Sequence, residues 1–293
     1  MSRATLIVNP LATGVDEARL ALVEQALGRT ASIETLLTER RGHATEMARD
    51  VAGEVDAIFV ISGDGGFNEV ANGLPPDGPP LAPIPGGGTS VFPRSLGLSR
   101  DPLRAADQLA DAFVRGRERR LSVGRVNGRR FLFNAGLGLD GELVRRIEAG
   151  RSQAGRPGDV SFLLTLLHLI GERRGRFDPA IDIEGVGRAA FLMVANNDPY
   201  TYLGRMPVHV APEARFEHGL SALAPRQTSP LSVVRLLAYV LSGRGGSSTL
   251  VDVDTIRART DYPLPLQTDG EDLGDVTNAV FEAERDAIRV LVP

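Results

Sequence analysis

The stretch AIFVISGDGGFNEVANGL at residues 57–74 decides how the amino-terminal part of this chain folds. Residues 57–61 are all apolar, which is typical of a strand that is buried on both faces of a parallel sheet. Residues 62–66 contain three glycines, which allow the backbone to turn sharply and to approach a ligand closely. Residues 67–74 then have helical spacing. A strand, a glycine turn and a helix in this order predict a ligand site beyond the carboxyl end of the strand.

The segments around this stretch repeat the alternation of strand and helix. We expect strands at residues 4–8, 33–37 and 57–61, and helices at residues 16–27, 43–52, 67–74 and 101–115. The proline- and glycine-rich segment 75–88 encloses one more short strand. Strands and helices that alternate at this spacing indicate a parallel α/β layer.

The character of the sequence changes after about residue 120. Short apolar runs separated by turns predict strands at residues 121–126, 131–133, 180–183, 191–194 and 208–210. We therefore predict an α/β fold with two domains. Residues 1–120 form an N-terminal parallel α/β nucleotide-binding domain, to which residues 276–293 return, and residues 121–275 form a C-terminal, mostly antiparallel β-sandwich domain.

The composition excludes several classes of function. The 293 residues carry a formal net charge of -4, which argues against a partner as negatively charged as a nucleic acid. The chain has no cysteine, so disulfides and thiolate metal sites are excluded. It also has no lysine, which excludes both a Walker A loop and the ATP site of protein kinases. Any phosphate must be held by backbone amides, arginine or a metal ion.

The glycine turn at residues 62–66 suits a phosphate without a lysine. A helix that begins beside it directs unpaired N–H groups and the positive end of its dipole at the ligand. Asp64 in the middle of the turn would repel phosphate unless it binds Mg²⁺ or accepts a proton from a nucleophile. The structural alternative is a tight turn with a capping aspartate.

Motifs along nearly the whole chain resemble those of the diacylglycerol kinase catalytic domain family, which includes the sphingosine kinases. The segment SGDGGFNEVANGL at 62–74 resembles the nucleotide loop of this family, and PGGGTSVFPRSLGL at 85–98 resembles its second glycine block. Shorter resemblances are NPLATG at 9–14, Thr38 with Gly-His-Ala at 42–44, FNAGLGLD at 133–140, YLGRMPVHVAP at 202–212 and QTDGE at 267–271.

The resemblance implies transfer of the γ-phosphate of ATP to the hydroxyl of a lipid, either diacylglycerol-like or sphingoid-like. In this family the site lies in a cleft where the α/β domain meets the β-sandwich domain. The residues that match the ATP-binding motifs are Asn9, Thr13, Thr38, Ser62, Gly63, Gly65, Gly66, Asn68, Gly87, Gly88 and Thr89.

The resemblance also implies catalytic roles. Glu271 matches a general base for the lipid hydroxyl, and Asp64 and Asp269 match residues that organise Mg²⁺. In the sphingosine kinase branch the aspartate that matches Asp64 is itself the proposed base, so both assignments stay open. Asp140 is expected either to contact the lipid headgroup or to be a solvated helix cap. Gly66, Ser90 and Ser122 depart from the family, which usually has threonine, asparagine and aspartate at these positions.

Two other functions stay open at this point. The NAD kinases share a Gly-Gly-Asp-Gly loop, so the acceptor could be a soluble nucleotide, and a relative could keep the fold without turnover. We expect a cytoplasmic protein, because residues 1–3 lead directly into a strand with no signal-peptide pattern. Residues 160–170 and 231–241 are predicted to be core helices, although one of them could line an acyl-chain groove or contact the inner face of the membrane. A homodimer is also an expectation.

Overall fold

The computed structural model describes residues 2–12, 16–87, 90–154, 159–204, 206–244, 246 and 248–293. Thr13, Gly88 and Thr89, which we expected to bind ATP, lie outside these residues. The chain forms two compact units. Unit 1 comprises Met1–Val123 and Arg285–Pro293, and unit 2 comprises Gly124–Glu284.

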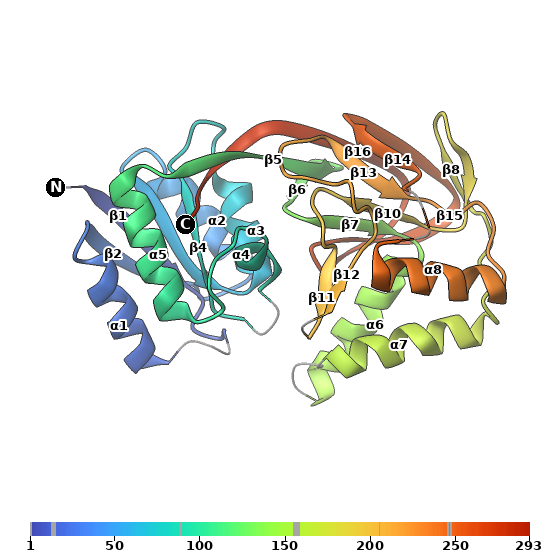
Figure 1. The fold of residues 1–293 in the computed structure, drawn as a ribbon, viewed down its shortest axis with the longest axis horizontal. Coiled ribbons are helices and arrows are strands. Elements are labelled where there is room, and N and C mark those ends of the chain that lie inside the picture. Colours follow the sequence, from blue (N-terminus) through green and yellow to red (C-terminus); the bar gives the residue numbers. More distant parts are fainter. Residues whose placement is uncertain are drawn as a thin grey trace. The chain divides into compact units, whose positions relative to one another are not determined.

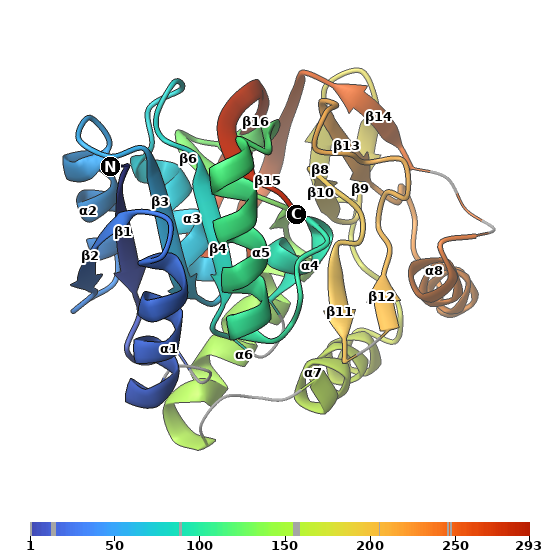
Figure 2. The same cartoon turned by 60° about the vertical axis from the view of Figure 1, so that its left-hand side comes forward.

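Unit 1 is a parallel sheet with helices on both faces. Its elements are β1 (Arg3–Val8), α1 (Glu17–Leu27), β2 (Ser32–Leu37), α2 (His43–Val51), β3 (Ala57–Ser62), α3 (Asp64–Gly73), β4 (Leu81–Pro85), α4 (Val91–Ser95) and α5 (Pro102–Arg115). The strands lie in the order β4-β3-β1-β2, and each neighbouring pair is parallel. Helices α1 and α5 cover one face of this sheet, and α2 and α3 cover the other (Figures 1 and 2). Near the end of the chain, Val290 pairs in parallel with Leu81.

The local sequence explains where these elements begin. Every residue of β3 is buried, as its apolar run predicts. Asp16 and Asp101 are the N-caps of α1 and α5, and their carboxylates accept hydrogen bonds from the backbone N–H of Arg19 and Arg104 at 2.8 and 2.9 Å. These bonds satisfy N–H groups that have no partner within the helix.

Helix α3 begins three residues earlier than the sequence pattern predicted, at Asp64 instead of Phe67. Gly63 is its N-cap, and the Gly63 carbonyl accepts the N–H of Gly66 at 3.0 Å. The glycines of the turn therefore belong to the first helical turn. The N–H of Gly66 is used within this turn, whereas Gly65 carries no side chain that would keep a ligand from its N–H.

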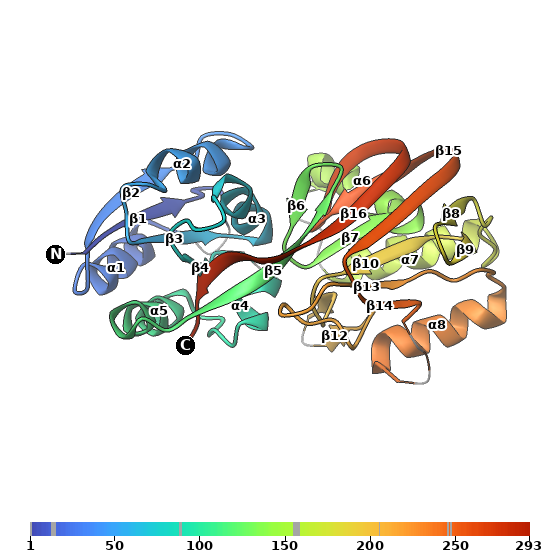
Figure 3. The same ribbon diagram turned by 90° about the horizontal axis from the view of Figure 1, so that it is seen from above.

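Unit 2 consists mainly of antiparallel strands. Its elements are β5 (Glu118–Val126), β6 (Arg129–Phe131), β7 (Asn134–Leu137), α6 (Leu139–Ala154), α7 (Asp159–Glu172), β8 (Ile181–Ile183), β9 (Gly187–Ala189), β10 (Leu192–Ala195), β11 (Thr201–Leu203), β12 (Met206–Val208), β13 (Leu220–Leu223), α8 (Pro230–Ser242), β14 (Leu250–Val253), β15 (Thr255–Thr268) and β16 (Glu271–Leu291). Strands β5 and β16 each have residues in both units. Figure 3 shows the strands β14-β13-β10-β7-β15-β16 side by side in this order. The predicted fold class is thus confirmed, with parallel strands first and an antiparallel, strand-rich region after them.

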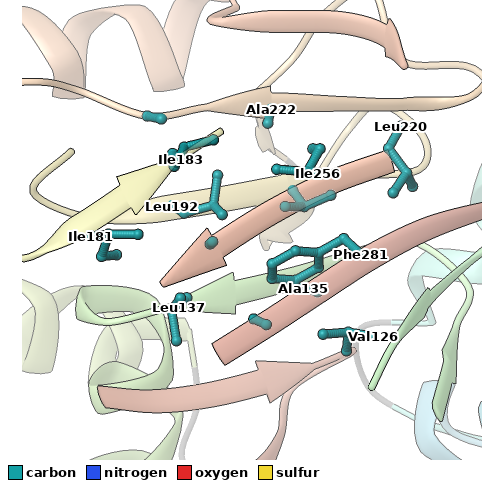
Figure 4. Packing of buried hydrophobic residues seen from close by; sticks show 14 of the residues in the cluster. Val126, Ala135, Leu137, Ile181, Ile183, Leu192, Leu220, Ala222, Ile256 and Phe281 are labelled. Atoms are coloured by element: carbon teal, nitrogen blue, oxygen red, sulfur yellow. The ribbon is translucent and has the colours of Figure 1, made fainter. Parts of the chain in front are cut away.

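The core of unit 2 lies on one face of these strands. Ala135 and Leu137 of β7, Leu192 of β10, Ile256 of β15 and Phe281 of β16 are at most 2% exposed and form one cluster (Figure 4). Alternate residues of each strand reach this cluster, because successive side chains of a strand point to opposite faces. No helix in the described part of the chain is long and apolar enough to cross a membrane.

Candidate functional site

A cavity of about 280 Å³ lies beyond the carboxyl ends of β1, β2 and β3 in unit 1. Five of the residues that we expected to bind ATP line it, namely Asn9, Thr38, Ser62, Gly65 and Gly66. They come from three loops that are far apart in the sequence. Parallel strands bring their carboxyl ends to one edge of the sheet, and the loops after them meet there.

Backbone hydrogen bonds hold these loops together. The N–H of Asn9 donates to the carbonyl of Ile61 at 3.0 Å, and the N–H of Thr38 donates to the carbonyl of Val8 at 2.9 Å. These bonds continue the pairing of the strands into the first residue of each loop, so the sheet anchors the loops that line the cavity.

The two glycine-rich loops pass each other backbone to backbone. A Cβ atom on Gly87 would lie 3.0 Å from the Cα of Gly63, which is closer than side chains normally approach. Ser90, which has a left-handed φ of 46°, donates its hydroxyl to the carbonyl of Gly87 at 2.9 Å. Gly87 is thus explained by close packing of the loops beside the cavity, whereas a Cβ atom on Gly63 would lie 3.9 Å from the Cα of Gly87, an ordinary contact.

Asp64 connects the same two loops. Its Oδ2 accepts the N–H of Val91 at 3.0 Å and its Oδ1 accepts the N–H of Phe92 at 2.9 Å, so its carboxylate caps the short helix α4. Burial raises the pKa of Asp64, and these two amide hydrogen bonds oppose that shift. Each carboxylate oxygen accepts one of these bonds and retains further acceptor capacity that could face a metal ion.

Glu69, which lines the same cavity, caps the neighbouring helix α2. Its carboxylate accepts the N–H groups of Gly42 and Ala44 at 2.9 and 3.3 Å. This explains why Gly-His-Ala at 42–44 and the loop at 62–74 occur together. Asn68, which like Glu69 lies on α3, is 3% exposed. Its backbone and side-chain oxygens accept hydrogen bonds from Asn72. The interior position of Asn68 places it beside the cavity lining and not within it.

The structure explains why residue 66 is glycine. A Cβ atom on Gly66 would lie 2.5 Å from the Cβ of Ser62 and closer still to its hydroxyl. Ser62 is 1% exposed, and its hydroxyl has no hydrogen-bond partner among the described residues. The side chain of Ser62 therefore fills the space that the threonine usual in this family would need.

We expect Gly66→Ala to destabilise unit 1 by about 1–3 kcal/mol, because the new methyl group overpacks the space held by Ser62. The double variant Ser62→Gly/Gly66→Ala removes the collision, and its melting temperature should return to the wild-type value or exceed it. Thermal unfolding of both variants, with ATP binding by calorimetry, measures the effect. A Gly66→Ala protein as stable as the wild type would contradict this explanation.

A second cluster of expected residues lies in unit 2, at the turn from β15 to β16. The turn residues Asp269 and Gly270 have left-handed φ values of 48° and 83°. The carboxylate of Asp269 accepts three backbone N–H groups, those of Leu132, Phe133 and Asn134, at 2.7, 3.0 and 3.0 Å. Asp269 thus fastens this turn to the connection between β6 and β7.

A buried polar network lies behind this turn. Asp140 is 5% exposed, and its Oδ2 accepts the Tyr200 hydroxyl at 2.5 Å as well as the amide of Gln267. The Gln267 carbonyl in turn accepts the N–H of Gly270 at 2.9 Å. The alternative that Asp140 is a solvated helix cap is wrong, because Asp140 is the second residue of α6 and faces this network.

Burial raises the pKa of Asp140, and burial together with the charge of Asp140 raises the pKa of Tyr200 well above its usual value. The folded state therefore holds the proton of Asp140 more tightly than the unfolded state does. We expect stability to fall as the pH rises from about 4 through the folded-state pKa of Asp140.

Asp140→Asn should flatten this part of the stability curve, because the amide does not titrate and its oxygen still accepts both hydrogen bonds. Burial also raises the pKa of Asp198, so the difference between the two curves is the quantity to measure. Urea unfolding of wild type and variant over a pH series provides it. Parallel curves would show that Asp140 does not carry this titration.

Glu271 follows the turn and is the first residue of β16. Its carboxylate forms an ion pair with Arg129, and 24% of its side chain remains exposed. Asp64 belongs to unit 1, whereas Asp140, Asp269 and Glu271 belong to unit 2. Within the described residues, no group of three or more His, Cys, Asp or Glu side chains is placed to hold a metal ion.

Several functional candidates were missed from the sequence. Arg40 and Arg41 line the cavity and offer positive charge near it, although neither stands in a glycine motif. Tyr200 and Gln267 form hydrogen bonds with Asp140 across 60 and 127 residues of sequence. The only sequence signal for them was their position next to, or within, segments that resemble family blocks.

The fold and the cavity together define a two-unit α/β protein with a glycine-loop site at the edge of a parallel sheet. The expected family resemblance is confirmed: residues 3–126 match the family model described as the diacylglycerol kinase catalytic domain. The match covers the loops that line the cavity and ends near the boundary of the two units.

Individual relatives agree with this match. The diacylglycerol kinase of Bacillus subtilis is 38% identical over 149 residues, which are 49% of this chain and 48% of that protein. The diacylglycerol kinase of Staphylococcus epidermidis is 35% identical over 137 residues, which are 44% of this chain and 42% of that protein. The matched part of the chain therefore spans about half the length of these curated relatives.

A solved structure extends the similarity to the whole fold. The crystal structure of a diacylglycerol kinase from Bacillus anthracis matches with a TM-score of 0.75 and 24% sequence identity. The match covers 100% of this chain and 97% of that chain. At this identity the likeness concerns the fold. None of these comparisons supports the NAD kinase-like alternative.

Proposed function

We propose that this protein is an ATP-dependent lipid kinase, which transfers the γ-phosphate of ATP to the hydroxyl of a diacylglycerol-like or sphingoid-like lipid. One observation carries the proposal: the residues that match the kinase family model form the cavity-lining loops of unit 1. The expected roles of 1–120 in ATP binding and of 121–275 in lipid binding are part of the same proposal.

The cavity of unit 1 suits a nucleotide in a protein without lysine. Gly65 and Gly66 in the first turn of α3 line it, and the N-terminal end of the helix dipole favours a phosphate there. Arg40, which is ion-paired with Glu46, and Arg41 place guanidinium groups at the cavity, which Glu39 and Glu69 also line. Asn9 and Thr38 supply polar side chains at the ends of β1 and β2. The positions of these residues around the cavity support their proposed contacts with the nucleotide.

Mg²⁺ accompanies ATP in phosphoryl transfer and neutralises charge on the phosphates. Asp64 is the better placed of the two aspartates for this ion, because its carboxylate lies between the two glycine loops of unit 1. Asp269 lies in unit 2, where its carboxylate holds the turn by three backbone amides. We assign to Asp64 the contact with the ion and to Asp269 the fastening of the turn.

Glu271 is the better supported general base. Its side chain is 24% exposed beside Arg129, whereas Asp64 caps α4 and is assigned to the metal ion. In the transfer, the Glu271 carboxylate accepts the hydroxyl proton while the hydroxyl oxygen bonds to the γ-phosphorus. The bond from that phosphorus to the bridging oxygen breaks, and ADP leaves.

The network behind the turn would position this base. Asp140 orients Gln267, and Gln267 holds the N–H of Gly270, which precedes Glu271. Asp140 would then act on the lipid through the turn, since its buried carboxylate already has two donors. The earlier expectation of a direct headgroup contact at Asp140 has less support from this geometry.

A lipid acceptor implies work at a membrane. Peripheral contact with the inner face of the membrane, from the cytoplasm, belongs to this proposal, as does a homodimer. The non-catalytic alternative rests on the departures at Gly66, Ser90 and Ser122 from the family motifs. The packing of Ser62 against Gly66 supplies a structural reason for the first departure that involves no loss of activity.

The test is ATP turnover by the purified chain with Mg²⁺ and a panel of lipids in mixed micelles, beside the Glu271→Gln variant. Phosphate transfer that depends on the lipid and that the variant lacks would establish the kinase and its acceptor class. Transfer to soluble nucleotides alone would favour the NAD kinase-like function. Nucleotide binding without any transfer would favour the non-catalytic one.

A further inference from the structure

Helix α8 is apolar on its outward face as well as on its buried face. Leu231, Val234 and Leu241 are 61%, 62% and 42% exposed, and Ala238 between them is also exposed. The spacing of these residues, three or four apart, places them in one stripe along the helix. The sequence of α8, PLSVVRLLAYVLS, contains no acidic residue. A surface helix that only covers the hydrophobic core normally has polar residues on its outward face.

Helix α7 exposes a similar apolar stripe. Leu163, Leu164 and Leu167 are 41%, 60% and 46% exposed. Ile170 of α7 and Leu236 of α8 pack on the same hydrophobic cluster of unit 2. The two helices also lie on the same side of the strands of unit 2 (Figure 1). The prediction that both apolar stretches are core helices is therefore wrong for these outward positions.

Unpaired arginines accompany the two stripes. Arg235 lies on α8 and Arg244 just after it, and Arg174 and Arg176 follow α7. All four are exposed, and in the described part of the chain none of their guanidinium groups has an ion-pair or hydrogen-bond partner. A Cβ atom on Gly175 would lie 3.1 Å from the Cα of Pro230, so the second pair of arginines lies beside the start of α8.

The nearby acids only partly offset this charge. Glu172 at the end of α7 forms ion pairs with Arg146 and His168, and Glu213 accepts the hydroxyl of Ser248. Asp178 is exposed between the arginines and the core. Elsewhere in the described residues, exposed large apolar side chains are distributed over different elements, such as Leu22 on α1, and this is ordinary for a protein surface.

We propose that the α7/α8 face is a docking surface for an anionic lipid bilayer. The face consists of Leu163, Leu164, Leu167, Leu231, Val234, Ala238 and Leu241 with Arg174, Arg176, Arg235 and Arg244. Apolar side chains on a helix that carries cations insert into the boundary of headgroups and acyl chains. Guanidinium groups form paired hydrogen bonds with phosphate, which suits them to phospholipid headgroups.

The charge of the face decides between a bilayer and a second copy of the chain. A symmetric dimer through this face would bring four unpaired arginines of each copy together, which is unfavourable without counter-charges. An anionic bilayer supplies those counter-charges. The inference rests on the proposed function to the extent that a lipid kinase must reach its acceptor in a membrane.

Vesicle co-sedimentation of the full chain tests the proposal. The wild type should bind vesicles of phosphatidylglycerol and phosphatidylcholine, bind pure phosphatidylcholine more weakly, and lose affinity in high salt because salt screens the arginines. Leu231→Glu/Val234→Glu should bind at least tenfold more weakly, and so should Arg235→Gln/Arg244→Gln. Leu22→Glu, at an exposed leucine of unit 1, should bind like the wild type.

Several results would overturn the proposal. They are equal vesicle binding by the wild type and both double variants, no binding by the wild type, and a wild-type dimer that Leu231→Glu/Val234→Glu converts to a monomer. Phosphate transfer to a short-chain diacylglycerol tests the kinase proposal separately from the docking proposal, because this acceptor is monomeric and requires no contact with a bilayer. The docking variants should retain this activity, and its absence in every protein would refute the kinase while leaving vesicle binding informative.

Discussion

Asp269→Ala is expected to be the most destabilising single replacement at the two sites. It leaves the N–H groups of Leu132, Phe133 and Asn134 without their acceptor, and losing buried hydrogen bonds of this kind costs on the order of 3 kcal/mol in total. Alanine at a φ of 48° adds about 1 kcal/mol of backbone strain, which aspartate tolerates better. The melting temperature of unit 2 should fall by roughly 10 °C.

Asp286→Ala is the matched control for this change. Asp286 also has a left-handed φ, of 52°, but it is exposed, and no backbone amide of the described residues is recorded as bound to its carboxylate. The control therefore carries the strain without the lost hydrogen bonds, and it should lose only about 1 kcal/mol. Thermal and urea unfolding of both variants measures the difference. Equal losses would show that the three amides contribute nothing and that the turn is held by its backbone alone.

Glu271→Gln is expected to have the largest effect on activity, with turnover falling by about 10²- to 10⁴-fold. The amide cannot accept the proton of the acceptor hydroxyl, yet it keeps the size of the side chain and an oxygen that can face Arg129. Nucleotide affinity and melting temperature should therefore change little. A loss in kcat with an unchanged KM for ATP is the expected pattern.

Glu282→Gln, the same change at an exposed position of the same strand, is the control and should keep full turnover. Asp64→Asn distinguishes the two candidate bases. If Glu271→Gln retains turnover, Glu271 is not the base, and a Mg²⁺ titration of Asp64→Asn then separates loss of the metal ion from loss of a base at Asp64. A pH profile of kcat for each active protein then shows which carboxyl titrates in the reaction.

The cavity of unit 1 was the part of the candidate site whose geometry local sequence predicted best. Asn9, Thr38 and the glycine turn at 62–66 each follow an apolar run that reads as a buried strand. In a parallel sheet the loops after such strands must meet at one edge, so their proximity follows from the pattern. The start of α3 was misplaced, because glycine normally disfavours helix and here occupies the first turn, where a ligand needs bare backbone.

The partners of the acidic residues could not be predicted in this way. The donors to Asp64 lie 27 and 28 residues away in the sequence, and those to Asp269 lie 135 to 137 residues away. A carboxylate in a glycine turn looks the same whether it binds a metal or caps a helix. Only the fold determines which amides approach it, and the amides decide how much of the carboxylate is left for other ligands.

The sequence by itself determined the fold class, the position of the glycine loops and the lack of any lysine, because these depend on local periodicity and residue type. The tertiary structure decided which side chains are buried or bonded within the protein and which remain exposed. It closed the space at Gly66 with Ser62, buried Asp140 in a network, and left Leu231 and Val234 of α8 exposed. A helix with apolar residues all round gives no local sign of which face is covered, since burial depends on what packs against it.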